Sequence, residues 1–374
     1  MYNYKIYKKG VYILTVIKKE FLFFICLITL FLLTLNNPKE IYNFFNYINW
    51  PTIRALFILL VLTTAIKISN FFDILAVKFI TIFKNEKTLA LFFIILTSIL
   101  AMFLTNDITL FIVVPITLAI SNVIKNDITK IIIFEAISAN VGSLLTPIGN
   151  PQNLYLFREW HINFTDFINI MMPIFVIKFL ILLLFVIIIF PLKKIEIKEI
   201  KQNNYHLFLF LISLLFFILF IVALNLNFVR YLIPIIIISF LFIKKEVLIE
   251  MDWFLILTFI LMFIDFNIIA DIDIIKNIIN SFDLNFFNVM NITVFLSQFI
   301  SNVPATIFML QFSDNYEAIA YGANIAGSGL VFASLANIIA VRMLNDNKAY
   351  LTFHKFSLPY FFTSYGVILL LFFN

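Results

Sequence analysis

The chain has little of the chemistry on which soluble enzymes depend. Only 13% of its 374 residues are charged, whereas a typical soluble domain has about 25% charged residues. It has one cysteine, Cys26, inside an apolar run, and its three histidines (His161, His206 and His354) have no spacing suited to a metal ion. These shortages argue against a soluble globular fold, a disulfide framework and a cysteine-based metal or redox centre.

Basic residues are too dispersed to indicate a nucleic-acid partner, although the formal net charge is +5. What the chain has instead is hydrophobic sequence, at 63% of all residues and a mean hydropathy of +1.06. Apolar runs of near-spanning length recur along it, enough for about ten to eleven crossings of a ~30 Å hydrocarbon core. We therefore predict an all-α polytopic membrane protein embedded in the lipid bilayer.

Glycine is scarce, and its placement is informative. Five of the seven glycines fall in Ser138–Asn153 (SANVGSLLTPIGNPQN) and Gly322–Asn337 (GANIAGSGLVFASLAN). The two stretches align without a gap and pair similar residues: Ala139 with Ala323, Asn140 with Asn324, and Asn153 with Asn337. Glycine and proline at membrane depth break a helix and free backbone groups, which survive only where they line a cavity or an ion site. Two matching breaks predict a carrier with a central binding site.

Lysine and arginine in the short loops predict the orientation. With 88–121 and 286–312 taken as re-entrant pairs, twenty of the 26 basic residues fall in inside loops and four in outside loops. This asymmetry predicts a cytoplasmic N-terminus and an outside C-terminus, and the expected location is the cytoplasmic membrane. The halves are then two inverted-topology repeats, each with a re-entrant hairpin and a broken transmembrane helix. Residues 1–192 form the first repeat with an N-terminal helix, 193–205 a cytoplasmic linker and 206–374 the second repeat.

Four segments resemble a known family: FLTNDITLFIVVPI (103–116), ANVGSLLTPIGNPQNLYL (139–156), SNVPATIFML (301–310) and GANIAGSGLVFASLANIIA (322–340). On these segments the chain resembles the ion transporter superfamily. That group includes arsenite efflux permeases, NhaD-type sodium/proton antiporters, citrate-transporter-like proteins and divalent-anion sodium symporters. The resemblance implies two re-entrant hairpins and two unwound helices that meet at a central site. The first hairpin tip reads Thr-Asn-Asp, unlike the Ser-Asn-Thr of the dicarboxylate branch, and is more similar to the arsenite and antiporter branches.

The resemblance also implies which residues bind the substrate and the ion. The first hairpin tip supplies Thr105, Asn106 and Asp107, and the second supplies Ser301, Asn302 and Thr306. The first break supplies Asn140, Gly142, Pro147, Gly149 and Asn150. The second break supplies Asn324, Gly327, Ser328 and Gly329. Na⁺ is the candidate coupling ion at Asn106, Asp107 and Asn302, and no other cofactor is expected.

Broken helices can serve an anion or an alkali cation, because half-helix N-termini offer N–H groups and C-terminal ends offer carbonyl oxygens. Asp107 binds Na⁺ or a proton, caps the helix that follows it, or does both. Lys178 and Asp265 lie mid-span, where each needs a partner or a water-filled path, unless Lys178 snorkels to the interface. Glu135, near the start of its run, is expected at the interface.

The leading interpretation is a secondary active transporter of a small anion, either citrate or another carboxylate, or an inorganic oxyanion such as arsenite, coupled to Na⁺ or H⁺. A Na⁺/H⁺ antiporter with Asp107 as the shared site is the alternative within transport. An integral-membrane enzyme is a distant alternative, because the short loops carry no cluster of carboxylates, histidines or arginines. We therefore expect no enzymatic activity, and a homodimer is left open.

Overall fold

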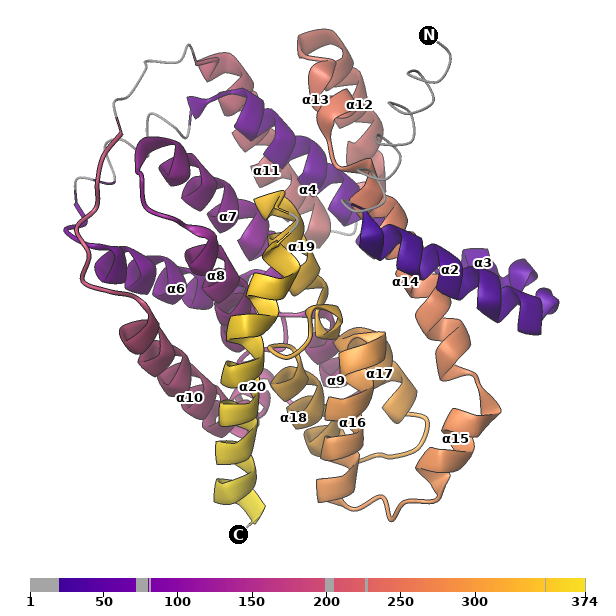
Figure 1. Cartoon of the computed structure of the whole chain (residues 1–374). Coiled ribbons are helices and arrows are strands. Elements are labelled where there is room, and N and C mark those ends of the chain that lie inside the picture. The colour runs from indigo at the N-terminus through magenta and orange to yellow at the C-terminus, as the bar shows by residue number, and fades with distance from the viewer. Residues whose placement is uncertain are drawn as a thin grey trace, which may run out of the picture. The chain divides into compact units, whose positions relative to one another are not determined.

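A computed structural model of the chain describes residues 20–71, 80, 82–198, 205–225, 228–346 and 348–373 (Figure 1). All regular elements of these residues are helices, which confirms the predicted all-α class. Residues 11–19 of the expected N-terminal helix and residues 199–204 of the expected linker lie outside the described part.

The first half of the chain contains α2 (Phe21–Asn36), the 3-10 helix η1 (Pro38–Asn43), α3 (Phe44–Tyr47), α4 (Trp50–Ile68), α6 (Glu86–Phe103), α7 (Asn106–Val123), α8 (Thr129–Ser143), α9 (Pro151–Trp160) and α10 (Phe164–Ile189). The second half contains α11 (Leu207–Asn225), α12 (Val229–Ile243), α13 (Glu246–Glu250), α14 (Trp253–Ala270), α15 (Asp273–Asn280), α16 (Phe286–Ile300), α17 (Asn302–Met309), α18 (Tyr316–Ala326), the 3-10 helix η2 (Val331–Ala333), α19 (Leu335–Leu344) and α20 (Ala349–Phe373).

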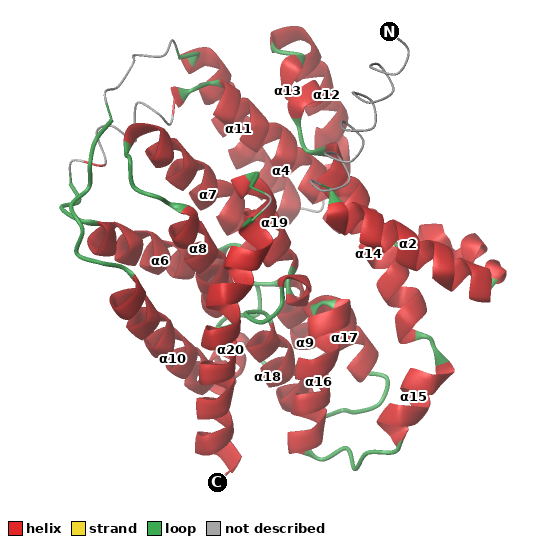
Figure 2. Ribbon diagram, viewed as in Figure 1, coloured by secondary structure: helices red, strands yellow, loops and turns green. Residues whose placement is uncertain are grey.

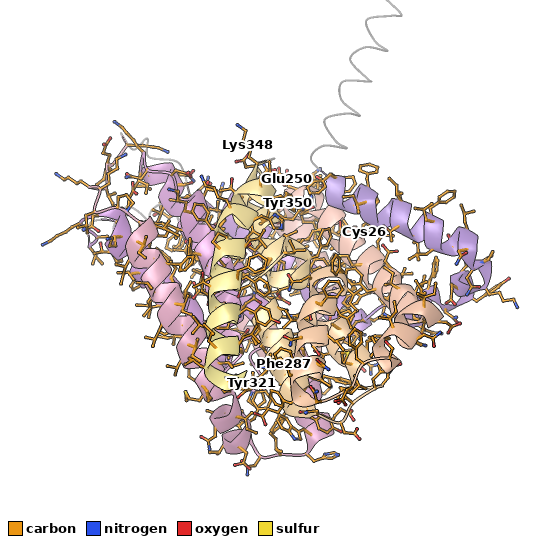
Figure 3. The ribbon with its side chains drawn as sticks, turned by 60° about the horizontal axis from the view of Figure 1, so that its bottom comes forward. Cys26, Glu250, Phe287, Tyr321, Lys348 and Tyr350 are labelled. Carbon is orange, nitrogen blue, oxygen red and sulfur yellow. The ribbon has the colours of Figure 1, made fainter. Side chains whose placement is uncertain are left out.

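Five of the described helices are long and apolar enough to cross a membrane, namely α4, α6, α7, α10 and α20. At 1.5 Å per residue, α10 extends roughly 39 Å, which exceeds a ~30 Å hydrocarbon core. One face of α10 exposes Leu180, Leu184 and Ile188, as contact with lipid requires. Figure 3 shows α20 running from the end marked by Lys348 to the end marked by Tyr321. The protein is therefore membrane-embedded and multi-pass, while the number of crossings and the inverted orientation of the halves stay predictions.

The chain forms two compact units, each built from both halves of the sequence. Unit 1 is Met1–Val61 with Phe216–Ile272, and unit 2 is Leu62–Leu215 with Asp273–Asn374. The proposed boundary at 193–205 is thus not a boundary between compact units, and the division into repeats stays a prediction.

Unit 1 contains none of the predicted tip and break residues. In it, α2 packs against α14, where the rings of Phe23 and Phe254 meet edge to face with centroids 5.3 Å apart. Asp252 caps α14 by accepting a hydrogen bond from the Leu255 amide at 3.0 Å. Asp265 is buried in this unit, at 2% exposure.

Unit 2 contains two series of helices in the same order. In the first, α6 and α7 form a hairpin, and α8 is separated from α9 by a loop. In the second, α16 and α17 form a hairpin, and α18 is separated from α19 by a loop with one short 3-10 turn. α6 packs against α8, and α16 packs in the same way against α18. Figure 2 shows loop segments lying among α9, α18 and α20, inside the unit rather than at its ends.

The described part of the expected linker is fastened to the first hairpin. The carbonyl of Lys193 accepts from the Glu86 amide at 2.9 Å, and the carbonyl of Glu196 accepts from the Lys125 amide at 2.9 Å. The Lys198 amide donates to the carbonyl of Val123 at 2.8 Å. Residues 193–198 therefore hold the start of α6 and the end of α7 together (Figure 1).

Candidate functional site

Each broken helix carries an asparagine in its last turn. Asn140 lies near the end of α8 and Asn324 near the end of α18, and both are almost fully buried. The Nδ2 of Asn140 donates to the carbonyl of Ala136 at 3.1 Å, and the Nδ2 of Asn324 donates to that of Ala320 at 2.8 Å. The two side chains are therefore held in the same way, because each donates to the backbone carbonyl one turn earlier in its own helix.

The two asparagines cross over to the opposite series of helices. Asn140 Nδ2 donates to Asn337 Oδ1 at 2.8 Å, and Asn324 Nδ2 donates to Asn153 Oδ1 at 2.6 Å. Because the gapless alignment pairs Asn140 with Asn324 and Asn153 with Asn337, each contact is the counterpart of the other. Four amides thus join α8 to α19 and α18 to α9.

A second pair of bonds follows the same alignment. Asn150 Nδ2 donates to Asn324 Oδ1 at 3.0 Å, and Ser334 Oγ donates to Asn140 Oδ1 at 2.8 Å. Positions 150 and 334 are also equivalent in the alignment. We refer to the linked polar residues as the amide network: Asn140, Asn150, Asn153, Asn324, Ser334 and Asn337. The network is buried throughout, at 4% exposure or less for every member.

The network also donates hydrogen bonds to backbone carbonyls of the two breaks. Asn153 Nδ2 donates to three carbonyls at the end of α8 and in the first loop: those of Ser143 at 3.3 Å, Leu144 at 3.1 Å and Thr146 at 3.1 Å. Asn337 Nδ2 donates to two carbonyls of the second loop: those of Gly327 at 2.9 Å and Leu330 at 3.3 Å. A buried carbonyl without a donor costs free energy, so these amides make the breaks tolerable inside the unit.

The first hairpin tip is joined to this network. Thr105 caps α7, since its side chain accepts from the Ile108 amide at 3.3 Å. The Asn106 amide donates to the carbonyl of Gly149 at 2.9 Å. Asn106 Nδ2 donates to Asn140 Oδ1 at 3.2 Å. The tip, the first loop and the network therefore form one connected set.

Asp107 does not cap α7, because Thr105 does. Its amide donates to Asn106 Oδ1 at 3.0 Å, while its own Oδ1 is buried without a hydrogen-bond partner among the described residues. Thr105 is the cap, so the alternative in which Asp107 caps α7 is wrong. A buried carboxylate oxygen without a donor is available to a cation or a proton.

The second hairpin tip is held mainly by its own residues. Ser301 has a positive φ of 69°, and its Oγ donates to Asn302 Oδ1 at 3.4 Å. Thr306 Oγ1 donates to the carbonyl of Asn302 at 2.8 Å, and α17 packs against α9 and α18. Within the described residues no hydrogen bond joins Asn302 to Asn106 or Asp107. The Na⁺ position expected at these three residues stays a prediction.

Two of the predicted glycines permit close backbone approaches at the first break. A Cβ on Gly142 would overlap the carbonyl of Ser98 in α6, and a Cβ on Gly149 would overlap the carbonyl of Ser143. Pro147 lies in the turn between them, where its missing N–H and fixed φ prevent the helix from continuing. At the second break, the Gly327 carbonyl accepts from two network amides, and Ser328 Oγ is buried without a partner in the described residues.

A family model described as "Citrate transporter" matches residues 11–317. The chain belongs to the citrate transporter family. It is 34% identical over 314 residues to "Inner membrane protein YbiR" of Escherichia coli strain K12, which covers 83% of this chain and 84% of that protein. It is 38% identical over 336 residues to "Uncharacterized transporter MJ0456" of Methanocaldococcus jannaschii, which covers 87% and 90%. "Putative transporter arsB" of Dictyostelium discoideum is 27% identical over 133 residues, which covers 36% and 23%.

Membership in the citrate transporter family confirms the resemblance inferred from the four segments. These relatives are named as membrane proteins or transporters, and the described helices are apolar and of spanning length. The chain is therefore a membrane transporter.

In this member of the citrate transporter family, two residues on other helices bond to the backbone of the second break. Neither was predicted from the sequence. In α16, Gln298 Nε2 donates to the carbonyl of Ala326 at 3.2 Å, and its Oε1 accepts from the Leu330 amide at 2.8 Å. In α20, Ser357 Oγ donates to the carbonyl of Gly329 at 2.8 Å. Neither Gln298 nor Ser357 lies in an aligned stretch, so the repeat gave no signal for them. Asn153 and Asn337 were visible in the alignment but were not predicted as site residues.

Two buried ionisable side chains complete the site region. Lys178 of α10 is fully buried, and its Nζ donates to the carbonyls of Asn324 at 3.0 Å and Ile325 at 2.9 Å, so it does not snorkel. Glu135 of α8 is also fully buried and accepts from Thr117 Oγ1 at 2.5 Å. Glu135 lies among the helices α7, α10 and α19, which pack around α8, and its expected position at the membrane interface stays a prediction.

Proposed function

We propose that this member of the citrate transporter family is a secondary active transporter that moves a small anionic solute across the cytoplasmic membrane, coupled to Na⁺ or H⁺. The observation that best supports it is the reciprocal exchange of amides between the two breaks. Breaks contributed by both halves of the sequence come together, and each supplies equivalent polar groups. This is the arrangement that two half-sites of a carrier require.

The chemistry of the network suits an anion. An asparagine amide carries two N–H donors and a carbonyl acceptor. The amides that now bond to one another can turn their N–H groups to the oxygens of a carboxylate or an oxyanion. Because the network is neutral, its bonds can be exchanged without leaving a buried charge unpaired. A dianion or trianion still needs compensation, which a co-transported cation supplies.

Asp107 is the proposed binding site of that cation. Its unpartnered Oδ1 lies on the residue next to Asn106, which bonds directly to the network. A cation at Asp107 would therefore be adjacent to the solute, so that each stabilises binding of the other by direct electrostatic attraction.

A Na⁺/H⁺ antiporter is the second candidate, and one observation favours it. None of the six network residues is cationic, whereas Asp107 presents a buried, unpartnered carboxylate oxygen. In that case Asp107 would bind Na⁺ and H⁺ alternately, and the network would only position the hairpin tip.

Reconstituted proteoliposomes distinguish these functions. We expect labelled citrate, succinate, phosphate or arsenite to accumulate under an inward Na⁺ or proton gradient and to stop when an ionophore dissipates that gradient. Proton movement driven by Na⁺ with no anion present would instead establish the antiporter. Absence of both fluxes in well-folded, correctly inserted protein would contradict the proposed function.

Site variants connect the flux to the hairpin tips. Asn106→Ala and Asn302→Ala should abolish uptake while the protein stays inserted and folded, because each removes an amide at a tip. Asn169→Ala is the matched control, since Asn169 is an exposed asparagine on α10 and its loss should leave uptake unchanged. Undiminished uptake in both tip variants would contradict the proposed site.

A further inference from the structure

A fully buried ammonium group lies at the C-terminal end of the second broken helix. Lys178 is at 0% exposure in the middle of α10. Its Nζ donates to the carbonyls of Asn324 and Ile325, in the last turn of α18, at 3.0 and 2.9 Å. The C-terminal end of a helix carries a partial negative charge, which favours a cation there. An isolated charge is costly in the membrane interior, so this contact is a specific arrangement rather than a packing accident.

Four successive carbonyls at that helix end, those of residues 324–327, have hydrogen-bond donors. Those of Asn324 and Ile325 accept from Lys178. That of Ala326 accepts from Gln298 Nε2 and from the Gly329 amide. The Gly327 carbonyl accepts from two network amides. Lys178 thus supplies the charged donor in a set that is otherwise neutral.

Within the described part of the chain, no such cation lies at the first break, although the alignment makes the two helix ends equivalent. The counterparts of Asn324 and Ile325 are Asn140 and Val141. The carbonyl of Asn140 accepts from Ser143 Oγ at 3.2 Å, and among the described residues no lysine or arginine bonds to either carbonyl. The breaks are therefore alike in their amides but unlike in their charge.

We propose that Lys178 is a resident cation of the second break, and that its ammonium occupies the carbonyl site where a discontinuous helix otherwise binds an alkali cation. Carbonyls at half-helix C-terminal ends are the ligands that carriers offer to Na⁺, and an ammonium makes the same charge-assisted contacts. The inference rests on the proposed function, and it adds that an exogenous coupling cation binds in the first half alone.

The position of Lys178 is itself fixed by neighbouring helices. Tyr360 of α20, also fully buried, donates its hydroxyl to the carbonyl of Lys178 at 2.8 Å. α10 packs against α18 and α20. The position of the ammonium within unit 2 is therefore fixed by helix packing. Removal of the ammonium should leave a cavity lined by two carbonyls.

Chemical rescue of purified Lys178→Ala tests the proposal without any transport measurement. The variant should unfold at a lower temperature than the wild type, and propylammonium should raise that temperature in a concentration-dependent way by binding the folded state. Propanol, of similar size but uncharged, should not. No loss of stability in Lys178→Ala, or equal rescue by propanol, would overturn the proposal.

Na⁺ provides a second readout that is independent of the first half-site. In an Asp107→Asn background, Na⁺ should stabilise the protein only when Lys178→Ala is added. A Na⁺ response that is the same with and without Lys178→Ala would contradict the proposal. If Lys178→Ala does not fold, Lys178→Arg should keep the fold while Lys178→Met loses stability, and the reverse order would overturn the inference. If the wild type transports nothing while amine binding is seen, the proposed function fails and the cation site stands.

Discussion

Ser301 holds a backbone conformation that few residues other than glycine adopt. Its φ of 69° and ψ of 157° place it outside the helix, strand and left-handed regions. Such strain costs on the order of 1–3 kcal/mol and clusters at functional sites. Here the strained residue lies at the second hairpin tip, directly before Asn302. Its backbone conformation sets the direction of the chain at Asn302.

Replacing Ser301 by glycine should relieve this strain. We expect Ser301→Gly to raise the free energy of unfolding by about 1 kcal/mol and to reduce the rate of uptake, because the tip becomes less rigid. Thermal unfolding and proteoliposome uptake measure the two effects. Ser301→Ala keeps the Cβ and removes only the hydroxyl, so an equal gain in stability for that variant would contradict the explanation.

The carboxylate of Asp107 should determine the cation dependence. Asp107→Asn keeps the shape of the side chain but removes its charge, so we expect exchange of the anion across the membrane to survive while gradient-driven accumulation is lost. Uptake measured against the Na⁺ and proton gradients checks this. Asp166→Asn is the control, because Asp166 is also an acid in the first turn of a helix but is exposed. Unchanged gradient dependence in Asp107→Asn would rule out its role.

Single residues were predictable where the chain repeats itself, or where a segment resembles the family, as at Asn106. Asn140 and Asn324 stood out because the alignment gave each a partner in register with glycine. Gln298 and Lys178 have no counterparts, so the carbonyls they bond to could not be inferred from the sequence. The burial of Glu135 was missed because a hydropathy run does not show which helices pack around its ends.

At the scale of elements, the two breaks are the common feature of both series of helices. α8 ends at Ser143 and α18 at Ala326, and the helices that follow return asparagines to the opposite break. The breaks are therefore held by one another rather than by each half alone. A substitution in one broken helix should therefore change the energetic effect of a substitution in the helix that it contacts.

A double-mutant cycle measures this coupling. For Asn140→Ala with Asn337→Ala, we expect a coupling free energy of about 0.5–3 kcal/mol, as contacting residues in one network show. Asn324→Ala with Asn153→Ala should give a similar value, since the two contacts are equivalent. Asn140→Ala with Asn169→Ala should be additive within about 0.5 kcal/mol. Additivity in both network pairs would contradict the reciprocal exchange.

The type and order of the helices followed from composition and from glycine and proline, but their lengths and packing did not. α6 and α7 each have 18 residues and are of spanning length, whereas α17 has only eight. The re-entrant course of both hairpins therefore stays a prediction. The two compact units could not be anticipated, because hydropathy shows which segments are apolar and not which helices pack together.

At the scale of the whole molecule, the network is closed to solvent. None of its six members is more than 4% exposed. A carrier must open such a site to each side of the membrane in turn. For the proposed binding site, transport therefore requires that the amide bonds between the breaks exchange.

Cysteine labelling tests the central claim most directly. The lone cysteine, Cys26, is removed by Cys26→Ala, and Ser328→Cys then places one thiol at the second break. We predict that a small impermeant thiol reagent modifies this thiol from either side of the membrane, and that a saturating concentration of the transported solute slows the reaction. Modification from one side alone, or at a rate that the solute leaves unchanged, would contradict a central site with alternating access.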